Sequence, residues 1–140
     1  MGGAVKTVIA GSRGIWDYQI LLVALESWLL PITAVLSGRA SGADRLGERY
    51  AREMALPMLP YPANWEKYGP SAGYLRNRQM ARDCDAAIIL WDGHSPGSKH
   101  MANLMDELDK PYLVHIADAY YRPYESALHQ AYAEGKVKGL

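Results

Sequence analysis

Short apolar runs alternate with segments of helical period along most of this 140-residue chain. The apolar runs are residues 5–10, 32–36, 58–61, 86–91 and 112–116. Strands separated by helices need crossover connections, and a parallel sheet covered by helices on both faces accommodates them. We therefore expect one Rossmann-like three-layer α/β domain over residues 1–140, with a mainly parallel sheet of about five strands.

The first predicted helix covers residues 18–30. Asp17 is a suitable N-cap for it, and Pro31 is expected to end it. Residues 20–30 of this helix are apolar on all sides, which predicts deep burial that includes a contact with a second copy of the chain. The sequence therefore indicates a homodimer or a higher homo-oligomer.

Three further helices are predicted in the core, at the segment that carries Leu46, Tyr50 and Met54 on one face, at 75–83 and at 98–108. Between them, the polar and aromatic residues 62–74 have no clear period and predict a loop. The core is expected to end near residue 117. A helical extension is expected over residues 118–140, where aromatic side chains such as Tyr120 would dock on the domain or on a second chain.

Fifteen acidic and fifteen basic residues leave the chain with a formal net charge of zero. A chain without excess basic charge has no general attraction for a polyanion or a membrane surface, so nucleic-acid binding is not expected. The longest apolar stretch, residues 20–32, is interrupted by Glu26, Ser27 and Pro31, whereas a membrane-spanning helix needs ~20 apolar residues. No secretory leader precedes the first strand, which predicts a cytoplasmic protein.

Metal and disulfide chemistry have little support in the sequence. Cys84 is the single cysteine, and the four histidines are scattered along the chain. A single cysteine forms no internal disulfide, and the usual zinc-ligand spacings are absent. We expect Cys84 to pack as a small apolar group, and we expect neither a metal site nor a required cofactor.

Small and polar residues follow the predicted strands at the points where the strands end. Residues 11–14 follow the first strand, residues 37–44 the second and residues 92–98 the fourth. The carboxyl ends of parallel strands meet at one edge of a sheet, where open α/β sheets bind ligands. Glycines there let backbone N–H groups approach an anion, and helix starts direct further amides to it. Phosphate is therefore the expected occupant, although neither the Gly-x-Gly-x-x-Gly pattern nor the P-loop pattern is present.

These loops, taken with the segment that follows the third strand, resemble a known family. The motifs are Ala10-Gly11-Ser12-Arg13, then Ser37-Gly38-Arg39-Ala40-Ser41-Gly42-Ala43-Asp44-Arg45, then Pro62-Ala63-Asn64-Trp65 with Gly69, Ala72-Gly73, Arg76-Asn77 and Met80, and finally Trp91-Asp92-Gly93-His94-Ser95-Pro96-Gly97-Ser98. They are similar to the YspA/YpsA-related branch of the SLOG superfamily, which also contains the Lonely Guy phosphoribohydrolases, long mislabelled lysine decarboxylases, and the DNA-processing protein DprA. The resemblance covers roughly residues 5–117 and implies a Rossmann-like domain that binds a nucleotide-derived ligand.

The enzymatic relatives carry two signatures that this chain matches incompletely. Arg76 with Met80 resembles their Arg-Lys pair before a Met on a helix, and residues 95–98 resemble a shortened Pro-Gly-Gly-x-Gly-Thr-x-x-Glu motif. Three residues beyond Ser98, the position of the catalytic glutamate holds Met101. The resemblance therefore leaves the catalytic residue unknown. The candidates for a replacement role are Asp92, Asp44, Arg76 and Glu107.

We expect a module that binds a nucleoside phosphate or an ADP-ribose- or NAD-like ligand, as a sensor or a sequestering protein. Glycine-loop amides and Arg76 would hold phosphate, Asp44 or Asp92 the ribose, and Trp65 the base. The expected ligand-contacting residues are Gly11, Ser12, Arg13, Gly38, Arg39, Ser41, Gly42, Ala43, Asp44, Trp65, Arg76, Asn77, Asp92, Gly93, Ser95, Gly97 and Ser98. The alternative is a phosphoribohydrolase-like N-glycoside hydrolase, and DprA-like binding of single-stranded DNA is a third, which the zero net charge disfavours.

Several of these side chains have a structural alternative. Asp44 is equally suited to cap the second helix. Arg76 is expected to open the helix before the fourth strand, where it suits phosphate recognition, but Arg76 and Arg78 are also typical of solvated helix charges. Trp65 and Tyr68 either cover the sheet or form a lid that stacks on a base.

Overall fold

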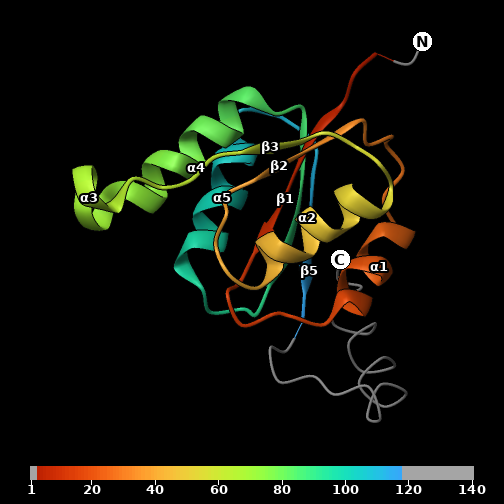
Figure 1. Ribbon diagram of the computed structural model, residues 1–140, viewed down its shortest axis with the longest axis horizontal. Helices are drawn as coiled ribbons and strands as arrows, with labels where there is room; N and C mark the ends of the chain where they lie inside the picture. The colour runs from red at the N-terminus through yellow and green to blue at the C-terminus, as the bar shows by residue number, and fades with distance from the viewer. Residues whose placement is uncertain (1–2, 118–140) are drawn as a thin grey trace.

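The computed structural model describes residues 3–117, which form a five-stranded sheet with helices on both faces (Figure 1). The strands are β1 (Lys6–Gly11), β2 (Ala34–Ser37), β3 (Met58–Pro60), β4 (Ala86–Trp91) and β5 (Tyr112–Ile116). Their order is β3-β2-β1-β4-β5, and every neighbouring pair is parallel. The predicted α/β class is confirmed, whereas the helix expected over residues 118–140 lies outside the described residues.

Helices from both halves of the described chain complete the three layers. They are α1 (Tyr18–Glu26), α2 (Ala43–Glu53), α3 (Trp65–Tyr68), a 3-10 turn η1 (Gly69–Ser71), α4 (Ala72–Asp83) and α5 (Pro96–Glu107). α1 and α2 pack on one face of the sheet through Leu21 and Leu46, and α4 and α5 pack on the other through Met80 and Met105. Within residues 3–117, no helix combines the length and the apolar character that crossing a membrane requires.

The central strands are buried on both faces. In β1, Ile9 joins the core under α1 and α2, whereas Val8 and Ala10 join the core under α4 and α5. Val8 and Ile9 are fully buried, and burial of one such side chain stabilises the fold by about 1.5–3 kcal/mol. A strand buried on both faces has an apolar residue at almost every position, which explains why β1 and β4 are evident in the sequence.

The first helix begins where predicted and ends earlier. The Asp17 carboxylate accepts a hydrogen bond from the Gln19 amide at 3.0 Å, which confirms the N-cap. The expectation that Pro31 ends the helix is wrong, because α1 ends at Glu26. Ser27 is the C-cap, and its hydroxyl donates to the carbonyl of Ala24 at 3.1 Å. A serine that bonds to the preceding turn competes with continuation of the helix.

Two apolar residues of the predicted helices are exposed. Leu29 follows the end of α1 and is 92% exposed, so the expected deep burial of residues 20–30 is wrong at this position. Met54 is the C-cap of α2 and is 56% exposed, while Leu46 on the predicted face is buried. In both cases the helix ends before the apolar pattern does, and the residues beyond it leave the core.

The predicted loop over residues 62–74 is wrong, because most of it is helical. Asn64 caps α3 with its side-chain oxygen, which accepts from the Lys67 amide at 3.0 Å. η1 and the first turn of α4 follow directly. The side chains of α3 and η1 are not buried, and Ala72 is the one buried residue in the first turn of α4. Because so few positions are buried, the segment has no helical period of apolar residues.

Lys110 holds the carboxyl end of α4. Its ammonium donates hydrogen bonds to the carbonyls of Ala81, Arg82 and Cys84, at 2.8, 2.9 and 2.8 Å. Cys84 is 2% exposed, and burial raises its pKa to about 11, which fits the predicted packing role. The last carbonyls of a helix lack intrahelical partners, and a cation there satisfies them and the helix dipole.

Lys110→Met is therefore expected to lower the free energy of unfolding by about 1–2 kcal/mol, because three carbonyls lose a charged donor. Urea denaturation followed by circular dichroism measures the effect. Lys99→Met is the matched control, because Lys99 is exposed and should tolerate the change. Equal stability of the two variants would contradict the assigned role of Lys110.

Candidate functional site

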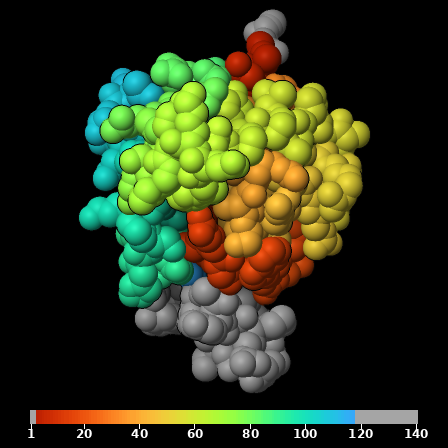
Figure 2. Space-filling model, turned by 60° about the vertical axis from the view of Figure 1, so that its left-hand side comes forward, coloured from red at the N-terminus to blue at the C-terminus, as the bar shows by residue number. Residues whose placement is uncertain are grey.

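The carboxyl ends of the central strands border a cavity of about 520 Å³. Its wall combines the loop after β1, the start of α2, the α3–α4 segment and the β4–α5 loop. In Figure 2 these segments, coloured red, orange, green and teal, adjoin one another on one face although they are far apart in sequence. A second cavity of about 390 Å³ shares part of this wall and extends along the β2–α2 loop and the residues after β3.

Most of the predicted ligand-contacting residues line one of these two cavities. The first is lined by Gly11, Ser12, Arg13, Asp44, Trp65, Arg76, Asn77, Asp92, Ser95, Gly97 and Ser98. The second is lined by Gly38, Arg39 and Ser41, together with Arg13, Trp65 and Arg76. The parallel sheet therefore brings the predicted loops together, while contact with a ligand stays a prediction for each residue.

Three of the predicted residues, Gly42, Ala43 and Gly93, line neither cavity. Ala43 lies behind the wall, where its amide donates to the carbonyl of Ser12 at 3.1 Å. Gly42 has a φ of +74°, and a Cβ at this position would lie 2.2 Å from the carbonyl oxygen of Arg13. Gly42 and Ala43 thus join the β1–α1 loop to the start of α2 and set the position of the residues that do line the cavity.

Other lining residues were absent from the predicted set. They are Ala10, Gly14, Ala40, Pro70, Gly73, Tyr74, Met80, Pro96 and Met101 in the first cavity, and Pro62 and Ala63 in the second. Pro70 and Tyr74 belong to the segment that was interpreted as a loop, so they were not predicted to face the site. The spacing of the buried residues Ala72 and Met80, two helical turns apart, was the available signal.

Arg76 lies in the second turn of α4, not at its start, because the helix begins at Ala72. The side chain is half-buried, and its Nε donates to the Asn77 side-chain oxygen at 3.1 Å. Nη1 donates to the carbonyl of Gly38, and Nη2 has no hydrogen-bond partner among residues 3–117. Burial lowers the pKa of Arg76, the charge of Asp44 opposes this, and Arg13 lowers the pKa further. The cation stays charged at neutral pH and keeps a free donor.

Asn77 connects α4 to α5. Its side-chain amide nitrogen donates to the carbonyl of Gly97 at 3.2 Å and lies 3.3 Å from Nδ1 of His100. The His100 ring also packs edge-on against Tyr74, with 4.5 Å between the ring centroids. These contacts fix the first turn of α5 relative to Arg76.

Asp92 organises the β4–α5 loop. Its carboxylate accepts hydrogen bonds from the His94 and Ser95 amides, both at 2.8 Å, and from the Ser95 hydroxyl at 3.0 Å. Burial alone would raise the pKa of Asp92, but the hydrogen bonds from Ser95 and His94 outweigh it and hold the pKa below its usual value. A carboxylate that is ionised and already hydrogen-bonded is poorly suited to donate a proton. Ser12 completes the network, because its Oγ accepts from the Asp92 amide at 2.9 Å.

Asp44 is the opposite kind of carboxyl group. It is 4% exposed, and because the N-cap of α2 is Gly42, the interpretation of Asp44 as a helix cap is wrong. Its Oδ2 accepts from the Ala40 amide at 3.0 Å. Burial raises its pKa, and the Ala40 amide and the charge of Arg76 lower it only in part. Within residues 3–117, no group of three or more His, Cys, Asp and Glu side chains, at Asp44 or elsewhere, could hold a metal ion.

Gly38 allows Asp44 and Arg76 to share one wall. A Cβ at Gly38 would lie 2.8 Å from both Asp44 Oδ2 and Arg76 Nη1, which is shorter than real contacts of this kind. The absence of a side chain at Gly38 therefore permits a buried carboxyl group and a guanidinium to approach the same point of the cavity.

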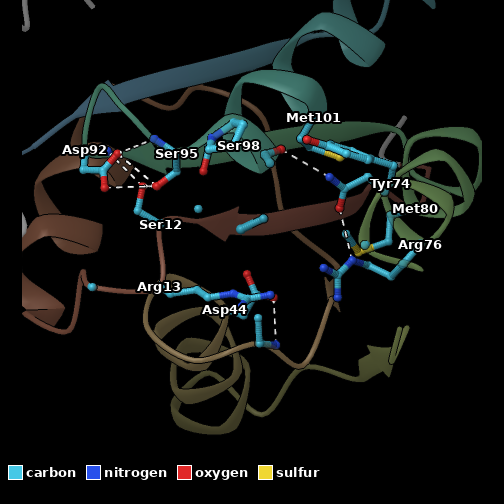
Figure 3. A pocket seen from close by; sticks show the side chains of 18 of the residues that line it. Ser12, Arg13, Asp44, Tyr74, Arg76, Met80, Asp92, Ser95, Ser98 and Met101 are labelled. Atoms are coloured by element: carbon cyan, nitrogen blue, oxygen red, sulfur yellow. Dashed lines mark hydrogen bonds between the residues drawn. The ribbon is translucent and has the colours of Figure 1, made fainter. Parts of the chain in front are cut away.

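The start of α5 presents unused donors to the first cavity. Pro96 is the first residue of this helix, and Ser95 makes no side-chain cap hydrogen bond because its hydroxyl is directed to Asp92. The amides of the first helical turn have no intrahelical acceptor. The Ser98 hydroxyl is buried, and it has no partner within residues 3–117 although Ser98 lines the cavity (Figure 3). Free amides and a free hydroxyl at a positive helix end are chemically suited to an anion.

The remaining predicted anion contacts differ from one another. Arg39 is paired with Glu48, with 2.6 Å between Nη1 and Oε1, so its charge is already compensated. Arg13 lies over the Trp65 ring, 5.8 Å from its centroid, and makes no ion pair within residues 3–117.

Trp65 is 49% exposed and lines both cavities, which excludes the alternative that it covers the sheet. Tyr68 is 46% exposed and lines neither cavity.

The chain is similar to a known family and to a phage protein. A family model described as the YspA, cpYpsA-related SLOG family matches residues 5–68, which include the loops after β1 and β2 and end before Arg76. The chain is also 36% identical over 104 residues to the Gene 61 protein of Mycobacterium phage D29. That alignment covers 68% of this chain and 83% of the phage protein.

Proposed function

This chain belongs to the YspA, cpYpsA-related SLOG family, and from this membership and the geometry of the first cavity we propose that it binds a nucleotide or a nucleotide-derived phosphate ligand. The observation that carries the proposal is the buried Ser98 hydroxyl, which has no protein partner and stands at the start of α5 beside the cavity. Free energy is lost when a buried hydroxyl has no partner, and a phosphate oxygen would supply one.

The parts of the ligand follow from the chemistry of the wall. The phosphate lies at the Gly97 and Ser98 amides, where the positive end of α5 has unused N–H groups. The free Nη2 of Arg76 is a further donor and carries positive charge. Ribose hydroxyls face Asp44, which has few other partners. The base stacks on Trp65, which is exposed at the mouth. The protein then acts as a sensor or sequestering module.

The test is titration of the purified protein with AMP, GMP, CMP and UMP by isothermal calorimetry, with thermal unfolding in parallel. A monophosphate at 100 times its Kd should stabilise the fold by about 2.7 kcal/mol. The corresponding nucleosides, which lack phosphate, serve as the control and should bind much more weakly. If no monophosphate binds more tightly than its nucleoside, the phosphate site at α5 is refuted.

Ser98→Ala is expected to weaken monophosphate binding about tenfold, because a hydrogen bond to a charged group contributes about 1.5 kcal/mol. The free energy of unfolding should not fall, since the hydroxyl has no partner to lose. Ser27→Ala is the matched control, because Ser27 lies at the end of α1 and lines neither cavity. Undiminished affinity in Ser98→Ala would show that phosphate does not contact this hydroxyl.

Hydrolysis of the N-glycosidic bond is the second candidate function, and Asp44 is the observation in its favour. Met101 lines the cavity and supplies no carboxylate, and the pKa of Asp92 is lowered, whereas the pKa of Asp44 is raised by burial. A buried acid of raised pKa can protonate the base as the N-glycosidic bond breaks, and the resulting carboxylate can then accept the proton that water releases when it adds to the sugar. Chromatography for free base after incubation with nucleotides tests it, and turnover should fall at least about 100-fold in Asp44→Asn.

Asp44→Asn also separates stability from function. The raised pKa of Asp44 means that folding disfavours its ionised form, so its contribution to stability is complete below pH 3.8 and is lost as the pH rises through the folded value. The asparagine variant should therefore be more stable than the wild type at pH 7, and this difference should shrink toward pH 4. Thermal unfolding across this pH range checks it, and a variant less stable at pH 7 would contradict the direction of the shift.

A further inference from the structure

The residue before α5 is of a type that normally caps a helix, yet its side chain leaves this helix uncapped. Ser95 is the N-cap of α5 and makes no side-chain cap hydrogen bond. The hydroxyl oxygen of an N-cap serine usually accepts from the amide of the second or third helical residue, here Gly97 or Ser98. The helices α1 and α3 are capped by their side chains, Asp17 and Asn64. α5 therefore lacks a contact for which its sequence is suited.

Asp92 holds the Ser95 hydroxyl away from these amides. Ser95 Oγ donates to the Asp92 carboxylate and lies 3.0 Å from each of its oxygens. A hydrogen bond to a carboxylate is roughly twice as strong as one between neutral groups, so this orientation of Ser95 is favoured over the cap. Ser12 fixes the pair, because its Oγ lies 3.0 Å from Ser95 Oγ and accepts from the Asp92 amide at 2.9 Å. Dashed lines connect Ser12, Asp92 and Ser95 in Figure 3.

This orientation of Ser95 leaves donors free in the first cavity. Gly97 and Ser98 line the cavity, and the Ser98 hydroxyl, on a residue that is 6% exposed, has no partner within residues 3–117. If Ser95 turned toward the helix, its oxygen would occupy one of the first-turn amides and stand where an anion would bind. The missing cap thus makes α5 less stable and keeps its amides available.

We propose that Asp92 is a positioning residue: by holding the Ser95 hydroxyl, it prevents α5 from being capped by its own side chain and keeps the first-turn amides free for an anionic group. The inference rests on the proposed function and deepens it, because it gives Asp92 an indirect role in place of the expected contact with ribose. Oδ1 of Asp92 already accepts from the His94 amide and from the amide and hydroxyl of Ser95, and Oδ2 accepts from the same hydroxyl.

The test measures AMP affinity by calorimetry in Asp92→Ala, in Asp92→Asn and in the double variant Asp92→Ala/Ser95→Ala. Both single variants remove the negative charge, but only asparagine keeps an acceptor at Oδ1. Asp92→Ala should bind AMP at least about fivefold more weakly than Asp92→Asn, because the released Ser95 hydroxyl caps α5 and competes with the phosphate. The double variant should regain the affinity of Asp92→Asn, because alanine in place of Ser95 has no oxygen to form the cap.

The amide signals of the ligand-free protein provide an independent readout. In ¹⁵N–¹H NMR spectra, the amide proton of Gly97 or Ser98 should move downfield in Asp92→Ala, where the cap forms, and should return in the double variant. Thermal unfolding verifies that each variant folds. Asp92→Leu, which has nearly the volume of the native side chain and no acceptor, takes the place of Asp92→Ala if that variant does not fold.

The outcomes separate this inference from the function on which it rests. Equal AMP affinity in Asp92→Ala and Asp92→Asn overturns the positioning role and leaves nucleotide binding intact. A double variant that stays as weak as Asp92→Ala also overturns it, because Asp92 would then act on the ligand or on the whole loop. If AMP does not bind to the wild type, the proposed function fails, and the amide signals alone decide whether Asp92 prevents the cap. Unshifted Gly97 and Ser98 amides in Asp92→Ala refute that role.

Discussion

Arg76→Met is expected to weaken binding of nucleoside monophosphates about 100-fold, because truncation of a half-buried cation that faces a phosphate costs about 2–5 kcal/mol. The substitution removes Nη2 of Arg76, which is the donor that we assign to the phosphate. The fold should persist, since the loss of the hydrogen bond to the Gly38 carbonyl and of the attraction to Asp44 is offset by removal of a half-buried charge and of its repulsion with Arg13. Calorimetric titration with AMP and thermal unfolding measure the two effects.

The matched control for this variant is Arg78→Met. Arg78 lies two residues further along α4, is exposed and lines neither cavity. It removes the same charge from the same helix, so it should bind AMP as the wild type does. Arg76→Lys should be intermediate, because lysine keeps the charge but not the planar fork of donors. Wild-type affinity in Arg76→Met would refute the phosphate site, whatever the control does.

Gly42→Ala is expected to lower the free energy of unfolding by at least about 3 kcal/mol, because an unfavourable backbone conformation and a steric clash add together. The φ of +74° with ψ of −125° is strained for any residue with a side chain, and the new Cβ would lie 2.2 Å from the Arg13 carbonyl oxygen. A loss of this size should lower Tm by about 10 °C in a domain of this length.

Gly97→Ala is the control for this substitution. Gly97 does not have a positive φ, and a Cβ there would have no heavy atom within 4 Å. It lies in the first turn of α5, where alanine is at least as favourable as glycine, so the stability should be retained. If Gly42→Ala unfolds at the same temperature as Gly97→Ala, the junction between the β1–α1 loop and α2 is not as tight as the structure indicates.

The accuracy of the sequence prediction follows burial. β4 has the predicted bounds, because residues 86–91 are apolar at every position, as expected of a strand buried on both faces. α1 and the α3–α4 segment were predicted less well, because their limits depend on single side-chain contacts. The Ser27 hydroxyl bond and the Asn64 cap are such contacts, and neither leaves a periodic signal.

The candidate site divides in the same way. Convergence of the loops after β1, β2 and β4 was predictable, since the carboxyl ends of parallel strands must share an edge. The partners of individual side chains were not. Arg39 and Arg13 are both arginines that follow a strand, yet within residues 3–117 only Arg39 forms an ion pair, because the second turn of α2 places Glu48 beside it.

The amino-acid pattern alone was sufficient to determine the layered parallel architecture and the edge at which the polar loops gather, because the length and period of apolar segments restrict how they can be connected and covered. Only the tertiary structure decided which of two chemically alike groups is free. Asp44 is buried with a raised pKa, while Asp92 is held ionised by hydrogen bonds from the His94 amide and from the amide and hydroxyl of Ser95. Arg39 is paired with Glu48, whereas Arg76 forms no ion pair within residues 3–117. Desolvation and hydrogen bonding depend on neighbours that are distant in sequence, and local spacing does not encode them.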